Sequence, residues 1–379
     1  MTKFFPTLEE SYVPDLNFGI GEIHDEFFSL ENISFWSSVI LNLPFYIPGS
    51  YAAMEGSRGF NTEASKYFKR VASIEFDPVK EVLATMGATQ ALNAAVNVMY
   101  DELIGFFYPG YPADSYLSSI RANLFPMEAT SPDELVDKLE KNAENLEAVI
   151  INTPNNPLGY SLGLDHLDAI GKIAEKHNIM LIMDVVYQTL TQKIKTLDYS
   201  SLPPDKTVFI ESFSKGMAAT CLRLGIAYSK NKKFLKKMKE FVADITVGVG
   251  TLSLYLGEAI LRAGVSSHAL LSKRYDAFYG AVDKIDFDSI GIMTPLKKED
   301  VGMMYVVLDA DNYCKQRKIS PIDVRNRLLE KDILVIPIQA FYPTGIEAPN
   351  KIRLSLGKVT AKDMYSSIKK LHGAFNSLS

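Results

Sequence analysis

The segment ESFSKGMAATCLRLG, residues 211–225, places Lys215 in a loop of small and hydroxylated residues directly after a short apolar run. A lysine in such a loop can be desolvated enough to react as an amine and form a Schiff base. Ser212 precedes it by three residues and Arg223 follows it by eight. Both side chains are donors suited to a dianionic phosphate. Each residue is common alone, but their order predicts a phosphate site beside a reactive lysine.

Outward from this segment, short β-rich apolar runs alternate with amphipathic stretches from about Lys80 onward. This order is typical of a mostly parallel sheet flanked by helices. The clearest helix covers 164–177, because Leu164, Leu167 and Ile170 share one face. After about residue 270 long helices and few strands follow, ending in an amphipathic helix from Ala361, which predicts a smaller α/β lobe. The predicted strands are Leu103–Tyr108, Ala148–Asn152, Met180–Asp184, Val208–Glu211, Leu224–Ser229, Met303–Leu308, Ile333–Ile336 and Ile352–Leu356.

The composition is that of an ordinary globular protein of 379 residues, with 47% hydrophobic and 22% charged residues. The net charge of −5 gives no electrostatic reason to expect nucleic acid or an anionic membrane, so a small-molecule substrate is favoured. The two cysteines exclude a disulfide framework and a cysteine-based zinc site. We find neither a signal peptide nor an apolar run of roughly 18 residues. The sequence therefore predicts a cytoplasmic protein.

Two further segments place candidate ligand-binding residues at turns. Ala88 and Thr89 open a run with helix-forming character, and a helix start with a nearby hydroxyl can bind an anion. A capped helix without a ligand is the alternative. Tyr111 lies in a Pro-bounded turn after a predicted strand, where its ring can stack on a planar ligand or simply pack in the turn.

Two more candidates follow predicted strands. Asn156 lies in the turn TPNNPLG, where prolines and a glycine fix the direction of its amide, although a plain turn is the alternative. Asp184 ends an apolar strand and Tyr187 follows three residues later. Open α/β sheets bind ligands at the carboxyl ends of their strands, and a buried carboxylate there needs a cationic partner.

Taken together, these motifs resemble the pyridoxal-phosphate-dependent aminotransferases of class I and II, the aspartate-aminotransferase-like fold family. The resemblance extends from GIGE at 19–22 to IRLSLG at 352–357. It implies a fold-type I enzyme that binds pyridoxal 5′-phosphate and moves an amino group between an amino acid and a 2-oxo acid. It also implies an N-terminal arm with part of the small domain over 1–45, a large cofactor-binding domain over 46–270 and a small domain over 271–379.

The resemblance implies a role for each candidate residue. Lys215 matches the lysine that forms the internal aldimine and shuttles a proton, and Asp184 matches the carboxylate that keeps the pyridinium nitrogen protonated. Arg353 resembles the arginine that grips the substrate α-carboxylate, and Gly21 a backbone contact near it. The remaining matches are Tyr187 and Asn156 as donors to the cofactor's phenolic oxygen, Tyr111 as the stacking ring, Ala88, Thr89, Ser212 and Arg223 as the phosphate site, and Tyr51 as the tyrosine that reaches the phosphate of a neighbouring subunit.

The match to Tyr51 implies a homodimer with active sites at the subunit interface. Leu158 departs from the family's usual threonine, and no second arginine for a distal carboxylate can be identified, so the side-chain preference stays open. His24 can face the substrate or lie in a surface loop. No histidine has metal-ligand spacing, so the sequence predicts no metal site.

Three alternatives to a transaminase can be compared with the same sequence. Another reaction on the same cofactor, such as that of a decarboxylase, a lyase or an oxidative amino-acid modifier, uses the same residues. A cofactor-sensing transcription regulator needs a DNA-binding module before the fold, whereas the family pattern here begins by Gly19. A nicotinamide dehydrogenase is disfavoured because no G-x-G-x-x-G follows a strand and opens a helix.

Overall fold

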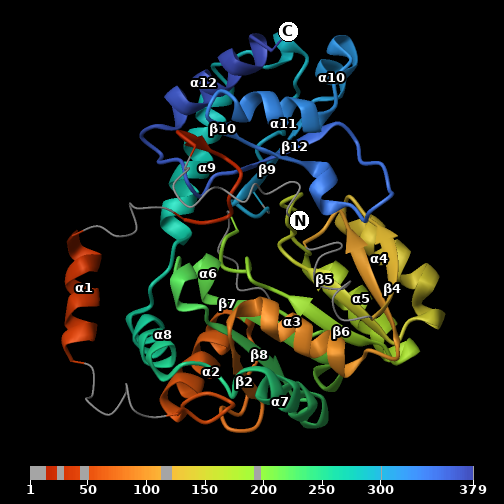
Figure 1. The fold of residues 1–379 in the computed structure, drawn as a ribbon. Helices are drawn as coiled ribbons and strands as arrows, with labels where there is room; N and C mark the ends of the chain where they lie inside the picture. The colour runs from red at the N-terminus through yellow and green to blue at the C-terminus, as the bar shows by residue number, and fades with distance from the viewer. Residues whose placement is uncertain are drawn as a thin grey trace.

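A seven-stranded sheet forms the centre of the larger part of the molecule (Figure 1). The computed structural model describes residues 14–23, 30–42, 51–111, 122–191, 198–299 and 301–378. In spatial order the strands are β2 (Val82–Thr85), β8 (Gly225–Ser229), β7 (Thr207–Ser212), β6 (Met180–Asp184), β5 (Ala148–Asn152), β3 (Leu103–Tyr108) and β4 (Asn123–Glu128). β8 alone runs in the opposite direction to the other strands of this sheet. The predicted α/β class with a mostly parallel sheet is confirmed.

The sheet is buried on both faces because its strands are apolar at nearly every position. Successive side chains of a strand point to opposite faces. On β6, Ile182 belongs to the cluster that includes α3 (Gly87–Val98) and α7 (Lys232–Thr246). Leu181 and Met183 belong to the cluster on the opposite face. The helices of that face are α2 (Arg58–Ala72), α4 (Pro132–Asn142), α5 (Leu164–His177) and α8 (Thr251–Ala263).

The helix predicted over 164–177 has those bounds in the structure. Leu167, Ile170 and Ile173 are buried, as the apolar periodicity requires, whereas Leu164 in the first turn, predicted on the same face, is 62% exposed. The helix ends where Asn178 adopts a left-handed conformation with φ 59°, a common way to end a helix. This agreement arises because both ends and the buried face are encoded in one short segment.

A smaller α/β unit lies at the other end of the molecule (Figure 1). It holds an antiparallel sheet in the order β11 (Ile336–Pro337), β12 (Lys351–Ser355) and β9 (Tyr305–Asp309). A further pair, β1 (Leu16–Asn17) and β10 (Ile333–Leu334), is parallel. The helices of this unit are α9 (His268–Val282), α10 (Asp311–Arg317), α11 (Pro321–Leu329) and α12 (Met364–Asn376).

Some predicted elements differ from the structure. The single strand predicted over Ile333–Ile336 is wrong, because β10 and β11 are two short strands in different sheets, separated at Val335. The sequence analysis also missed β2 and β4. Pro126 lies within β4, which is an edge strand, the position in a sheet that tolerates proline. The last helix begins at Met364 rather than Ala361.

Helix α1 (Leu30–Leu41) stands to one side of the rest of the chain (Figure 1). Ile40 and Leu41, at the end of this helix, are exposed. Within the described ranges, every helix is too short or too polar to cross a lipid bilayer.

Candidate active site

The carboxyl edge of the large sheet brings together residues from five separate parts of the chain. Asp184 ends β6, Asn152 ends β5 and Ser212 ends β7. Helix α3 begins two residues after the end of β2, and Tyr111 follows β3 by three residues. Strands that run in one direction end at one edge, so residues distant in sequence meet there.

A cavity of about 320 Å³ opens at this edge. Every predicted site residue lines it except Tyr51, which is 93% exposed at the start of a described range. His24 lies outside the described residues. The lining consists of Gly21, Ala88, Thr89, Leu92, Tyr111, Asn156, Asp184, Val186, Tyr187, Ser212, Ser214, Lys215, Thr220, Arg223, Tyr305 and Arg353. No three His, Cys, Asp or Glu residues gather as a metal site within the part of the chain that the structure describes.

One part of the cavity wall is rich in donors for an anion. The first-turn N–H groups of α3 have no acceptor within the helix, and the residue that precedes the helix, Met86, makes no side-chain hydrogen bond to it. Ser212 lies opposite Gly225 in the pairing of β7 and β8. A Cβ added at Gly225 would lie 2.7 Å from the backbone nitrogen of Ala88, so this glycine allows the strand to approach α3. The Arg223 guanidinium lies beside Gly87 at the same helix start.

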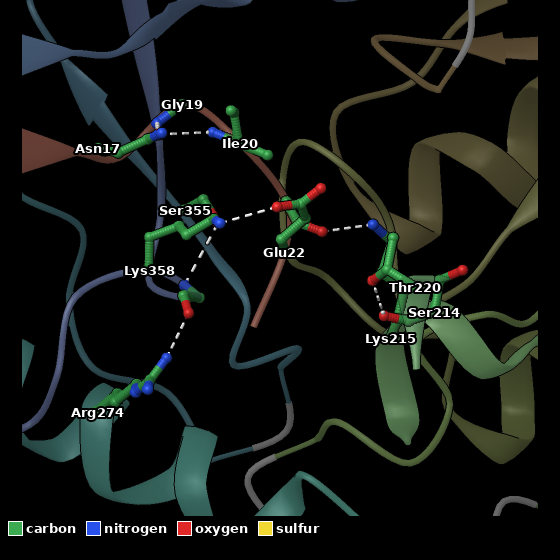
Figure 2. A network of polar contacts seen from close by, with 12 residues as sticks. Asn17, Gly19, Ile20, Glu22, Ser214, Lys215, Thr220, Arg274, Ser355 and Lys358 are labelled. Carbon is green, nitrogen blue, oxygen red and sulfur yellow. Dashed lines mark hydrogen bonds and ion pairs between the residues drawn. The ribbon is translucent and has the colours of Figure 1, made fainter. Parts of the chain in front are cut away.

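Lys215 lies in the short helix α6 (Phe213–Gly216), which begins directly after β7. The Ser212 hydroxyl accepts a hydrogen bond from the backbone N–H of Ser214 and thereby caps this helix. The Lys215 Nζ donates to the carbonyl oxygen of Gly21. Figure 2 shows that Glu22 of the N-terminal segment lies between Lys215 and Lys358. Lys358 pairs with Glu22 at 2.8 Å.

Asp184 is a buried carboxylate with few partners. Its Oδ1 accepts one long hydrogen bond from the backbone N–H of Val186, at 3.4 Å. Burial raises the pKa of Asp184 to about 7, even though the positive charge of Lys215 favours the ionised form. Asn152 lies next to it and donates to the Asp184 carbonyl oxygen at 3.2 Å. The carboxyl group therefore can accept a further donor or cation from the cavity.

Arg353 is a buried cation on β12, only 2% exposed. Its Nη1 donates to Asn156 Oδ1 at 3.3 Å and its Nη2 donates to the Gly19 carbonyl oxygen. Among the residues that the structure describes, its Nε has no hydrogen-bond partner and no carboxylate pairs with it. Burial lowers the pKa of Arg353. A buried guanidinium with neutral partners is suited to bind a carboxylate.

The structure adds residues that the sequence analysis did not single out. Tyr305 comes from β9 in the small unit, and its hydroxyl lies 3.2 Å from that of Tyr187. Glu211 is buried next to the lysine loop, where it accepts hydrogen bonds from Gln188 Nε2 at 2.5 Å and from the Ser212 N–H at 2.8 Å. Burial raises the pKa of Glu211 to about 8. Glu211 ends the predicted strand, which was a usable signal, whereas no local motif marks Tyr305.

Comparisons with known proteins agree with this geometry. The sequence profile of the family "Aminotransferase class I and II" matches residues 49–371. The aspartate aminotransferase of Bacillus subtilis is 25% identical over 326 residues, which cover 80% of this chain and 78% of that protein. A second Bacillus subtilis protein, YugH, is 29% identical over 187 residues, and this match covers 47% of the chain but only about half of YugH, 48%.

Solved structures show the same fold. The tetra mutant 1 of Thermus thermophilus aspartate aminotransferase superposes with a TM-score of 0.76 at 20% identity, covering 98% of this chain and 99% of that chain. At this identity the likeness supports the fold alone, and it confirms the fold-type I architecture. The family match includes every predicted site residue except Gly21. By its sequence profile, its fold and its motifs, the chain belongs to the class I and II aminotransferases.

Proposed function

We propose that this chain binds pyridoxal 5′-phosphate through Lys215 and transfers an amino group between an amino acid and a 2-oxo acid. One observation carries the proposal: a single cavity holds a donor-rich helix start, a buried carboxylate and a lysine amine. The family match supports the same cofactor, which class I and II aminotransferases use.

The residues present fit this cofactor chemically. The α3 start, Ser212 and Arg223 supply N–H and O–H donors and one positive charge, which suit a phosphate dianion. Asp184 is a carboxylate whose burial is unfavourable without a cationic partner, and a protonated ring nitrogen is such a partner. When bound, pyridoxal 5′-phosphate supplies a ring that accepts electron density from the substrate Cα.

Each side chain of the cavity then has a separate role in the reaction. The amine of Lys215 lies at the cavity wall, where it can take a proton from the substrate and return it. Asp184 keeps the ring nitrogen protonated by its negative charge. Tyr187 and Asn156 offer a hydroxyl and an amide to the phenolic oxygen, and Tyr111 offers a ring face for stacking.

Arg353 binds the α-carboxylate of the substrate. Its planar guanidinium matches a carboxylate with two parallel hydrogen bonds, and burial excludes water from that contact. The unpartnered Nε is available as one of the donors. This binding places the Cα of any amino acid near Lys215, because both residues line the same cavity.

We propose further that the active unit is a homodimer, with a large domain over 46–270, a small domain over 271–379 and an N-terminal arm over 1–45. The exposed Tyr51 ring and the exposed Ile40 and Leu41 at the end of α1 support the presence of a partner subunit. Pairing of β1 with β10 supports the grouping of the arm with the small domain. The free Cys221 and Cys314 are consistent with a reducing cytoplasm.

The experiment is a half-reaction screen. Protein loaded with pyridoxal 5′-phosphate is mixed with single amino acids, beginning with aspartate, the substrate that names a relative. Loss of the visible band together with pyridoxamine phosphate and a 2-oxo acid supports transamination. Release of carbon dioxide with an amine product supports a decarboxylase instead, and the absence of any visible band rejects the cofactor proposal.

A further inference from the structure

The Arg353 guanidinium lies over two aromatic rings. Its Cζ is 4.5 Å from the ring centroid of Tyr305 and 5.2 Å from that of Phe341. Tyr305 reaches it from the neighbouring strand, because Arg353 pairs with Val307 and Tyr305 lies two residues away on the same face. A cation over a desolvated ring face is attracted to the ring quadrupole. The two rings therefore hold the plane of the guanidinium.

The other end of Tyr305 contacts the larger part of the molecule. Its hydroxyl lies 3.2 Å from the Tyr187 hydroxyl, and the two rings meet edge to face, with centroids 5.5 Å apart and an interplanar angle of 77°. A Cβ added at Gly21 would collide with this hydroxyl. Both tyrosines are about 5% exposed, so water has little access to the contact. Tyr305 therefore touches the two residues proposed to hold substrate and cofactor.

We propose that Tyr305 is a positioning residue whose ring fixes the direction of the Arg353 guanidinium and whose hydroxyl turns the Tyr187 hydroxyl toward the cavity. The inference rests on the proposed function. Either hydroxyl can donate in the 3.2 Å contact, and the positive charge of Arg353 over the ring withdraws electron density from Tyr305, which favours Tyr305 as the donor. When Tyr305 donates, the Tyr187 oxygen is the acceptor and its own proton is left for the cavity. A phenol that accepts one hydrogen bond also donates the next more strongly.

Three substitutions separate the two roles of Tyr305. Tyr305→Phe keeps the ring beside Arg353 and removes the contact with Tyr187. Phe341→Leu is the matched control, since it removes one ring from Arg353 and leaves the tyrosine pair in place. Tyr305→Leu removes both functions. Each variant is loaded with pyridoxal 5′-phosphate and titrated with acid and base while its visible band is recorded.

The visible band changes with the protonation of the group that joins Lys215 to the cofactor. We expect Tyr305→Phe to raise the pKa read from this change by about 0.5 unit, because Tyr187 becomes a weaker donor to the phenolic oxygen. The KM for the fastest amino acid of the half-reaction screen stays within about twofold. Phe341→Leu raises that KM by about fivefold and leaves the band's pKa unchanged, since only a cation–π contact is lost. Tyr305→Leu changes both.

If the visible band of Tyr305→Phe titrates at the same pH as the band of the wild-type protein, the inference is overturned and the proposed function stays intact. If the wild-type protein forms no visible band, the proposed function fails and this inference fails with it. If Tyr305→Leu does not fold, the comparison of Tyr305→Phe with Phe341→Leu still decides whether the Tyr305 hydroxyl acts on Tyr187. Equal shifts of the pKa in these two variants would also contradict a specific role for the Tyr305 hydroxyl.

Discussion

Lys215 and Gly21 are 194 residues apart in sequence, and the amine of the first donates a hydrogen bond to the carbonyl oxygen of the second. The lysine belongs to the large sheet's carboxyl edge, while Gly21 follows the strand that pairs with the small unit. The Lys215 amine thus lies where the N-terminal segment meets the large sheet. This contact fixes its direction toward the cavity.

We expect borohydride reduction of the loaded protein to label Lys215, and peptide mapping checks this directly. Lys215→Ala keeps the phosphate donors, so it still binds the cofactor, but turnover falls by about 1,000-fold or more because the proton carrier is lost. Lys236→Ala on the exposed face of α7 is the matched control. Label on another lysine would refute the assignment.

Asp184→Asn tests whether the buried carboxylate acts in the chemistry. A neutral amide cannot keep a ring nitrogen protonated, so the rate of substrate deprotonation should fall by about 100-fold or more. The free energy of unfolding at pH 8 should not decrease. Burial disfavours the ionised form of Asp184, and the substitution removes this buried ionisable group. Stopped-flow absorbance and thermal unfolding give the two values. Near-normal deprotonation with cofactor bound would make Asp184 a structural residue.

Arg353→Lys should reduce kcat/KM by about 10-fold or more for every amino acid alike, since lysine offers a point charge instead of a planar pair of donors. The order of substrate preference should stay the same. Steady-state kinetics on three or more amino acids measure this, with Arg262→Lys on the protein surface as the control. A loss confined to one substrate would mean that Arg353 binds a side chain rather than the α-carboxylate.

Tyr51 is expected to act across the subunit interface, since it is 93% exposed and does not line its own chain's cavity. Mixing inactive Lys215→Ala chains with inactive Tyr51→Ala chains should restore activity, because a hybrid dimer contains one intact site. Activity after subunit exchange is the measurement. No recovery, with exchange demonstrated by labelled chains, would show that Tyr51 does not act across the interface.

Glu211 should make the stability of the cofactor-free protein depend on pH. Its pKa is raised from 4.5 to about 8 in the folded protein, so the folded state binds the extra proton between these values. The free energy of unfolding therefore falls as pH rises, by about 3 kcal/mol from pH 5.5 to 8. Glu211→Gln should remove this part of the slope in urea titrations. An identical slope in both proteins would show that Glu211 does not titrate in this range.

The residues of the large sheet were predictable because the signals are local. The strand that ends at Asp184 and the loop around Lys215 each carry their chemistry within a few residues of the strand end. Tyr305 was not predictable in this way. Its neighbours Arg353 and Tyr187 come from other elements, and the contact depends on how β9 packs against the large sheet. Likewise, the division of 333–337 into two strands depends on pairing with β1 and β12.

The bond from Arg353 to the Gly19 carbonyl joins positions 334 residues apart. During synthesis, a ribosome releases the N-terminal segment long before β12 exists. Strand β1 therefore stays unpaired until its partner strand β10, more than 300 residues later in the chain, has been made. Contacts of such long sequence separation form slowly, since a large loop must close first. The large sheet can assemble while the chain is still growing, but the part of the cavity proposed to bind the substrate is completed only after β12 has left the ribosome.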